Sequence, residues 1–333
     1  MKLINNKLNK IKETFLKIQN KNKFFKNKNI IKIICIFFII IILYFFINKC
    51  QFKIALCTMG KKENLYVQEF INYYKNLGVN KIFIYDDNDL NSEKISDVVN
   101  PLIINYVKIY NNMKYNIKTQ RSAFTDCYKK NKNKFKWFIM VDMDEFLVIV
   151  NGTLKKYLSN PVFDKCDFIK IHWIIPSDNN LIYYDNRSLF ERFKGPYKKS
   201  HFIKSIIKGN INNLLYAVHS PSFSPKNNIT CNNVGEIIKY NKLNFESVGK
   251  VNIKNAFIIH FKYKSTEEYI NKYKRGYINF FKKKNINKVL NTKIIEYFRD
   301  NKITMEKINY LENKLNLNLD KYKKFKNHSF KLN

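Results

Sequence analysis

Short apolar runs alternate with segments of helical periodicity from residue 53 onward. The first run, residues 53–58, is continuous and short, which is typical of a buried strand. Residues 61–78 follow with apolar side chains three and four positions apart, and this segment ends at Gly78 as many helices do. Residues 79–89 then predict a second strand, which runs into an acidic turn.

The same alternation continues beyond this turn. Residues 98–110 predict a third strand, which begins after Pro101, and residues 114–130 predict an amphipathic helix. Residues 134–149 predict a long buried strand with carboxylates embedded in it. This β-α-β-α-β order predicts an α/β fold in which helices flank a mixed, mostly parallel sheet. Ligands of such sheets bind at the carboxyl ends of the strands, where both acidic clusters of the chain are expected.

An apolar segment precedes these elements, at residues 30–49, and it has no charged residue between positions 33 and 47. Fifteen to eighteen helical residues would reach roughly 22–27 Å, slightly less than a bilayer core of about 30 Å. We expect an uncleaved signal anchor here, because a buried helix would show a polar face and a cleaved signal peptide would offer small residues. The Lys-rich tail, residues 1–29, predicts a cytosolic N-terminus and a single-pass type II membrane protein facing the ER or Golgi lumen.

The charge of the chain is strongly positive: 61 Lys and Arg stand against 26 Asp and Glu, a net charge of +35. Such a field favours polyanions, phosphate-bearing ligands or anionic membranes. The chain is also crowded with Lys, Asn, Ile, Phe and Tyr, whose codons are A/T-rich, so compositional drift also explains many solvated lysines. The positive charge alone therefore does not indicate a nucleic-acid partner, and we expect none.

Cysteines and sequons agree with a lumenal domain. Five cysteines follow the predicted anchor, and because this number is odd, at least one is free or pairs between chains: Cys50, Cys57, Cys127, Cys166 and Cys231. Four Asn-x-Ser/Thr sequons begin at Asn151, Asn186, Asn228 and Asn327.

The most informative cluster is Asp142-Met143-Asp144-Glu145, inside the apolar run WFIMVDMDEFLVI. Three carboxylates among apolar residues are costly unless a cation pairs with them. On a strand, Asp142 and Asp144 would share a face and could bind one divalent ion. The alternative is a charged strand edge or turn. No Gly-rich nucleotide loop and no HExxH motif occurs in the sequence.

Several segments resemble glycosyltransferases of the GT-A type, and family 92 most of all. They are ALCTMGKKENLYVQEFINYYKNLGVNKIFIYDDND, KTQRSAFTDCYKK, WFIMVDMDEF, KSIIKGNINNLLYAVHSP and IIHFKYKSTEEYINKYKRG, within residues 53–277. The resemblance implies a GT-A (Rossmann-like) fold, a UDP-sugar donor, a divalent metal such as Mn²⁺ and an inverting transfer of a hexose, with galactose as a candidate. Residues 173–180 depart from the family pattern, and so the acceptor glycan is left open.

The resemblance also suggests roles for single residues. Asp142 and Asp144 would bind the metal and the diphosphate, and His260 would be the third metal ligand, with His219 as its rival. The remaining donor-binding candidates are two acids for the nucleoside and two lysines for the diphosphate: Asp86, Asp87, Lys262 and Lys264.

An inverting transfer needs a carboxylate base, for which Asp178 and Glu191 are the candidates. Each could instead be a helix cap or an ion-pair partner. Two other function classes stay open: a catalytically inactive glycan-binding or scaffold protein of the same fold, and a polyanion-binding protein. The predicted organisation is a tail, an anchor, a catalytic domain and a Lys-rich helical extension, at residues 1–29, 30–49, 50–280 and 281–333.

Overall fold

The computed structural model describes most of the chain after residue 51. The described residues are 13, 34–39, 52–103, 105–111, 119–223, 228–238, 250–274, 286–316 and 318–323. The chain divides into two compact units, Met1–Phe52 and Lys53–Asn333. In the first unit residues 34–39 are helical, and the rest of the predicted anchor lies outside the described residues. Within the part of the chain that the structure describes, no helix is long and apolar enough to cross a membrane.

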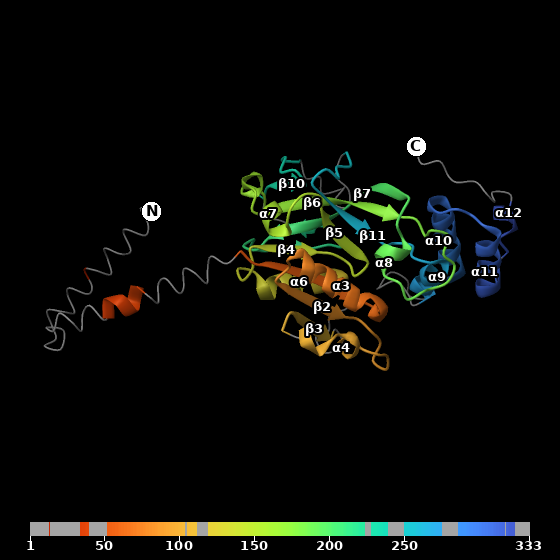
Figure 1. The fold of residues 1–333 in the computed structure, drawn as a ribbon, viewed down its shortest axis with the longest axis horizontal. Helices are drawn as coiled ribbons and strands as arrows, with labels where there is room; N and C mark the ends of the chain where they lie inside the picture. Colours follow the sequence, from red (N-terminus) through yellow and green to blue (C-terminus); the bar gives the residue numbers. More distant parts are fainter. Residues whose placement is uncertain are drawn as a thin grey trace. The chain divides into compact units, whose positions relative to one another are not determined.

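The second unit is built on a sheet whose first half is parallel (Figure 1). Four strands lie in the order β3-β2-β1-β4, and each pair of neighbours is parallel. Their bounds are β1 Ile54–Gly60, β2 Lys81–Asp86, β3 Val107–Asn111 and β4 Trp137–Met140. Because the chain runs outward from β1 to β3 and then returns to β4, the strand order reverses between β1 and β4. In open α/β sheets this switch point is where ligands bind.

The second half of the sheet continues from β4 in the order β7-β6-β11-β5, and β10 also pairs with β6. Strands β6 and β11 are parallel to each other, whereas β7 and β5 are antiparallel to their neighbours. The bounds are β5 Glu145–Ile149, β6 Phe168–Pro176, β7 Tyr197–Lys208, β10 Thr230–Asn232 and β11 Ala256–His260. A separate hairpin pairs β8 Leu215–Tyr216 with β9 Pro221–Phe223. The prediction of a mixed, mostly parallel sheet flanked by helices is confirmed.

Helix α6, Gln120–Asn131, packs closely on β1, and helix α3, Asn64–Leu77, contacts β5 and the short helix α4, Ile95–Val98. Helix α3 ends at Gly78 as predicted, and Gly78 adopts the left-handed conformation that favours glycine. Helix α6 begins where the Thr119 side chain accepts from the Ser122 amide. Its residue Cys127 forms a disulfide with Cys57 of β1.

The other helices are shorter or lie later in the chain. They are α4 Ile95–Val98, α7 Leu154–Leu158, α8 Leu189–Arg192, α9 Thr266–Lys274, α10 Ile286–Asp300, α11 Met305–Leu315 and α12 Asp320–Lys323. Two 3₁₀ turns, Pro101–Ile103 and Pro161–Phe163, complete the elements described after residue 51.

Two predicted elements differ from the structure. The predicted strand at residues 134–149 is two strands, because a turn follows Val141 and β5 then pairs with β11 instead of continuing β4. The predicted strand at residues 98–110 begins later, since Pro101 starts a 3₁₀ turn and β3 follows at Val107. The predicted start of the helix at residue 114 lies outside the described residues.

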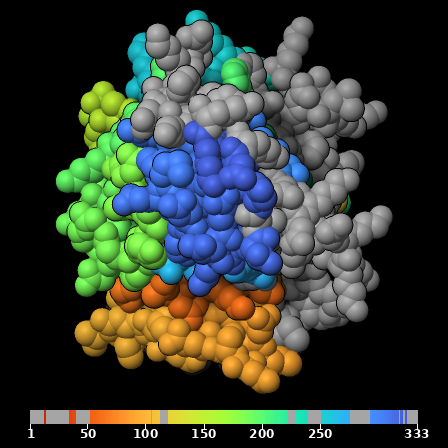
Figure 2. Space-filling model, turned by 90° about the vertical axis from the view of Figure 1, so that its right-hand side faces the viewer, coloured from red at the N-terminus to blue at the C-terminus, as the bar shows by residue number. Residues whose placement is uncertain are grey.

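The C-terminal helices share a core with the ends of the sheet strands. Figure 2 views this side, where the blue residues of the C-terminal helices lie between green residues on the left and orange residues below. The shared core includes Ile175, Tyr263, Tyr269, Tyr297, Phe298 and Leu311. The boundary that we predicted at residue 280 falls among residues 275–285, outside the described residues.

Candidate functional site

The acidic cluster forms a turn at the carboxyl end of β4, beside the end of β1. The Val141 amide donates to the carbonyl of Cys57, and the Glu145 amide closes the turn onto the carbonyl of Asp142 at 3.1 Å. Met143 packs against Gly60, where an added Cβ would come within 2.4 Å of the Met143 sulfur. Asp142 and Asp144 therefore lie in a turn, and the prediction that they share a strand face was wrong.

Asp142 and Glu145 meet a buried lysine from β7. The Lys204 ammonium lies 3.0 Å from Oδ1 of Asp142 and 3.5 Å from Oε2 of Glu145, and its side chain has no exposed surface. Gln120 of α6 also donates to Asp142. Burial, and next the Asp142 carboxylate, raise the pKa of Glu145 well above its ordinary value, although Lys204 opposes this. Asp142 and Glu145 are thus engaged by the protein itself.

Asp144 faces a different pair of residues, which come from β11 and α9. The Lys272 ammonium lies 2.6 Å from Oδ2 of Asp144, and Nε2 of His260 lies 3.6 Å from the same oxygen. Burial alone would raise the pKa of Asp144, but Lys272 and His260 hold it well below its ordinary value. Burial also lowers the pKa of His260, with Asp144 opposing, so the imidazole is neutral at neutral pH. A carboxylate, a neutral imidazole and an ammonium therefore meet at the switch point.

This cluster fits a divalent cation with two protein ligands. Two atoms that bind one cation at roughly 2.1 Å each lie within about 4.2 Å of each other, and Oδ2 of Asp144 and Nε2 of His260 meet this condition. The other ring nitrogen of His260 is buried and has no hydrogen-bond partner among the residues that the structure describes. Asp142 is directed to Lys204, and the described residues contain no group of three His, Cys, Asp or Glu side chains that could hold an ion.

The rival histidine lies nearby but does not contact Asp144 in any described interaction. His219 packs against Trp173 with ring centroids 5.1 Å apart, and His260 packs against the same indole at 4.4 Å. Burial, followed by the charge of Lys204, lowers the pKa of His219 to about 2. Within the described residues, His260 is the histidine that the fold brings to the acidic turn.

The two predicted diphosphate lysines form other ion pairs. Lys262 pairs with Glu296 of α10, and Lys264 pairs with Glu63 at 3.1 Å and lies over the ring of Tyr66. The ammonium at Asp144 belongs instead to Lys272, which the sequence reasoning missed. Nothing in the sequence around Lys272 distinguishes it from Lys274, the exposed lysine at the end of the same helix.

The predicted nucleoside acids are the last residue of β2 and the residue after it. Asp86 is buried, and its carboxylate accepts from the backbone amides of Asn88 and Ile95, both at 2.9 Å. Asp87 is half-buried, and its amide donates to the carbonyl of Gly60 at the end of β1. The turn after β2 is thus joined to the end of β1, the strand that the acidic turn also packs against.

The two predicted bases lie apart from Asp144 in the described contacts. Asp178 is buried among the C-terminal helices, 2.6 Å from the Lys307 ammonium and hydrogen-bonded to the Tyr297 hydroxyl. Glu191 is exposed and caps its own helix α8 by accepting from the amide and hydroxyl of Ser188.

Comparison with known proteins gives the family. The model of "Glycosyltransferase family 92" matches residues 51–319, which is more than half of the 333-residue chain. This chain belongs to glycosyltransferase family 92. The resemblance stated from the sequence is therefore confirmed.

Three family 92 relatives from plants match a shorter part of the chain. A protein of Ricinus communis is 29% identical over 102 residues, which are 31% of this chain and 17% of that protein. A protein of Oryza sativa subsp. japonica is 29% identical over 109 residues, 32% of this chain and 18% of that protein. A protein of Arabidopsis thaliana is 30% identical over 94 residues, 28% of this chain and 16% of that protein. The matched stretch thus spans less than a fifth of each relative.

Among solved structures, the chain resembles 4-diphosphocytidyl-2C-methyl-D-erythritol synthase from Anaerococcus prevotii. The TM-score is 0.26 with 7% identity, covering 47% of this family 92 chain and 70% of the other. At this score the likeness carries no argument about function.

Proposed function

We propose that this family 92 protein transfers a hexose from a UDP-sugar to a hydroxyl group of a glycan, on a sheet of the GT-A type. The observation that supports it most is the cluster of Asp144, His260 and Lys272 at the switch point of the sheet. A carboxylate, an imidazole and an ammonium together can receive a diphosphate and its cation.

Each residue of the cluster has a role in this proposal. Asp144 and His260 would hold a divalent cation, for which Mn²⁺ is the candidate; when bound, it neutralises the leaving diphosphate. Lys272 would donate to a diphosphate oxygen, the role that we first assigned to Lys262 and Lys264. Asp87, at the end of β2, would accept from the base or ribose of the nucleoside.

We propose further that the transfer inverts the configuration of the sugar, which requires a general base. Asp178 shares its carboxylate with Lys307 and Tyr297, whereas Glu191 is exposed at the surface of α8. Access to an acceptor hydroxyl therefore favours Glu191, and loss of kcat in Glu191→Gln with unchanged donor KM would support it.

The test is a screen of UDP-sugars for UDP release by the full chain, with Mn²⁺ and with EDTA. We expect release from at least one UDP-sugar, and a loss of about 100-fold or more in Asp144→Asn, on the scale of losing Lewis-acid assistance. The control is Asp89→Asn, because Asp89 is an exposed acid on the turn after β2. Full activity in EDTA would remove the metal from the proposal. No release from any UDP-sugar would favour the inactive glycan-binding protein.

The proposed location is the lumenal side of an ER or Golgi membrane, with residues 30–49 as the anchor. Two disulfides in the described residues, Cys57–Cys127 and Cys166–Cys231, support an oxidising compartment. Protease treatment of sealed microsomes should remove the N-terminal tail alone, and digestion of the whole protein would exclude this topology.

A further inference from the structure

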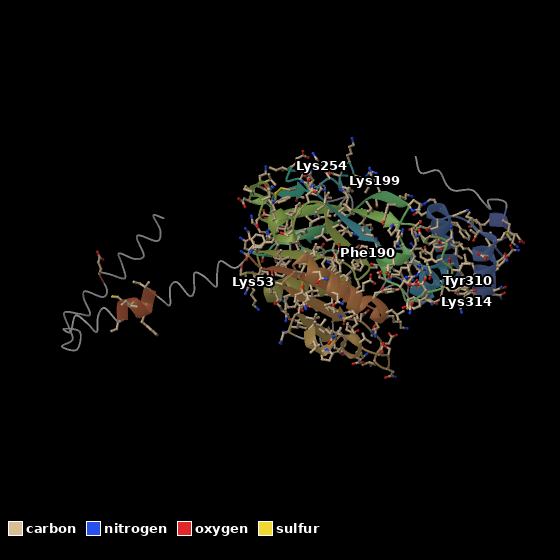
Figure 3. All side chains as sticks on the ribbon, in the orientation of Figure 1. Lys53, Phe190, Lys199, Lys254, Tyr310 and Lys314 are labelled. Carbon is tan, nitrogen blue, oxygen red and sulfur yellow. A yellow bond between two sulfur atoms is a disulfide. The ribbon has the colours of Figure 1, made fainter. Side chains whose placement is uncertain are left out.

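A groove lies between helix α3 and the segment that leads into helix α8. Six of its lining residues define what we call the α3 groove: Tyr66, Glu69, Tyr73, Tyr184, Asn186 and Phe190. Its volume is about 530 Å³, within the range of small-molecule sites. Figure 3 labels Phe190, which α8 presents next to α3. None of the residues that line the groove belongs to the acidic turn.

The aromatic part of the groove is held rigidly. The rings of Tyr73 and Phe190 are stacked, with centroids 5.4 Å apart and an interplanar angle of 13°. The Tyr73 hydroxyl donates to the carbonyl of Leu147 on β5 at 2.8 Å, and both rings pack against Phe146. Because these rings are fixed before a ligand arrives, little conformational entropy is lost when an apolar ligand face packs on them.

The polar part of the groove is close to neutral, in contrast to the chain as a whole. Oε1 of Glu69 accepts from the Leu189 amide at 3.0 Å, which orients this carboxylate on the groove wall. Arg187 is paired with Asp185 at 2.6 Å. With its basic residue already paired, the groove presents a carboxylate and amide groups, which suit hydroxyl groups better than sulfates or phosphates.

The groove is also connected to the acidic turn. Tyr66 lies on its wall, and the Lys264 ammonium lies 3.8 Å from the centroid of the same ring. Lys264 lies four residues after His260, whose imidazole is 3.6 Å from Asp144. On the other side Phe146, which supports the groove aromatics, follows directly on the acidic turn. A ligand in the groove would therefore be linked to the proposed donor site through Tyr66 and Phe146.

We propose that the α3 groove binds the acceptor, and that this acceptor is a neutral glycan whose pyranose rings pack on Tyr184 and Phe190 and whose hydroxyls bond to Glu69. The apolar face of a sugar ring matches the aromatic side chains, and its hydroxyl edge matches the carboxylate and amides. The inference rests on the proposed glycosyl transfer and adds its acceptor class. Tyr184 is 39% exposed, so its ring is accessible to a ligand.

The test is calorimetric titration of the full chain with four neutral tetrasaccharides and one sulfated one. The neutral probes are β-1,4-galactotetraose, cellotetraose, chitotetraose and mannotetraose, and the sulfated probe is a heparin tetrasaccharide. The chain is deglycosylated first, because Asn186 begins an Asn-Arg-Ser sequon and lines the groove. UDP is titrated in parallel, as an independent measure of the donor site.

We expect at least one neutral probe to bind and Tyr184→Ala to weaken it about tenfold, equivalent to about 1.4 kcal/mol. The matched control is Tyr183→Ala: Tyr183 is 63% exposed and packs on Tyr310 of α11, labelled in Figure 3 away from Phe190. This variant should change the Kd less than twofold. Glu69→Gln keeps an acceptor for the Leu189 amide, and should weaken binding about threefold or more.

Three results would overturn the inference: no neutral probe binds, Tyr184→Ala and Tyr183→Ala weaken binding equally, or heparin binds in a way that depends on Tyr184. Thermal unfolding midpoints of the variants show that each is folded. If UDP binds and no glycan does, the groove assignment fails and the proposed donor chemistry stands. If a glycan binds through Tyr184 and UDP does not, the proposed transferase activity fails and the groove stands.

Discussion

Replacing Lys204 by methionine would remove the cation that the fold places between two carboxylates. The Lys204 side chain is fully buried, and its ammonium contacts Asp142, Glu145 and the carbonyl of Val218 at 3.0, 3.5 and 3.0 Å. Methionine has a similar length and no charge. The substitution therefore tests how far the acidic turn depends on this internal cation.

The magnitude follows from what is left behind. Removing one partner of a buried ion pair costs about 3–5 kcal/mol. The Asp142 side chain is 27% exposed and keeps its bond to Gln120, and Glu145 can take up a proton, so the lower end applies. We expect Lys204→Met to lower the free energy of unfolding by about 3 kcal/mol. Typical domains have only about 5–15 kcal/mol in total.

The assay is urea unfolding of the full chain, followed by circular dichroism at pH 7. The matched control is Lys199→Met, an exposed lysine on the same strand β7 that Figure 3 labels, which should change stability by less than about 0.5 kcal/mol. In a Glu145→Gln background the cost of Lys204→Met should fall by about 1 kcal/mol or more, because one of the two carboxylates is then neutral.

The pH dependence gives a second readout. The folded-state pKa of Glu145 is above its unfolded value, so this group stabilises the fold at low pH. That contribution is lost as the pH rises through the folded pKa. Because Lys204 opposes the shift, Lys204→Met should move this loss to higher pH, and Glu145→Gln should abolish it. A loss below about 1 kcal/mol at pH 7, or no coupling to Glu145, would refute the reasoning.

Three further predictions concern buried groups elsewhere. Burial lowers the pKa of Lys170 to about 7, so the cost of burying this lysine grows as the pH falls from about 10.4 to 7. Lys170→Met should therefore raise the free energy of unfolding by about 1–4 kcal/mol at pH 7 and by little at pH 11. Urea unfolding that shows no gain at pH 7 would contradict this prediction. Asp178→Asn should lower the free energy of unfolding by about 3–5 kcal/mol with kcat nearly unchanged, whereas a 100-fold loss of kcat at unchanged stability would identify Asp178 as the base. The double replacement Cys57→Ala/Cys127→Ala should lower the free energy of unfolding by about 2–5 kcal/mol in the same assay. The control is Cys35→Ala, and equal stability of the two variants would argue against a structural disulfide.

The strands and the helix α3 could be predicted because their patterns are local. An apolar run such as 53–58 has few alternatives to a buried strand, and Gly78 marks the helix end through its own conformation. The turn after β4 could not be predicted in this way. The apolar residues continue on both sides of Asp142–Glu145, and the break exists because β5 leaves β4 to pair with β11, more than 100 residues later in the chain.

In the candidate site, too, some residues could be predicted from local sequence and others depend on contacts between distant segments. Asp144 and His260 were predicted as ligands of one ion, and the fold brings their side chains within 3.6 Å; the ion itself stays a prediction. Lys272 was missed, because its partner Asp144 is 128 residues away and only the packing of α9 brings them together. Lys204 could have been predicted as a buried cation from its sequence position. It stands in the apolar run of β7, where the cost of burial that pointed to Asp142 applies to a lysine as well.

The contacts of the acidic turn also explain why its two aspartates should differ in function. Asp142 is held by Lys204, which is fully buried and bound on three sides, so this pair cannot open without disrupting β7. Asp144 is paired with Lys272, whose side chain is 25% exposed and lies on a separate helix. Because Lys272 keeps access to solvent, its ammonium can move aside when a cation arrives to replace it at the buried Asp144 carboxylate. In the proposed function we therefore expect an arriving cation and diphosphate to engage Asp144, while Asp142 keeps the turn in place.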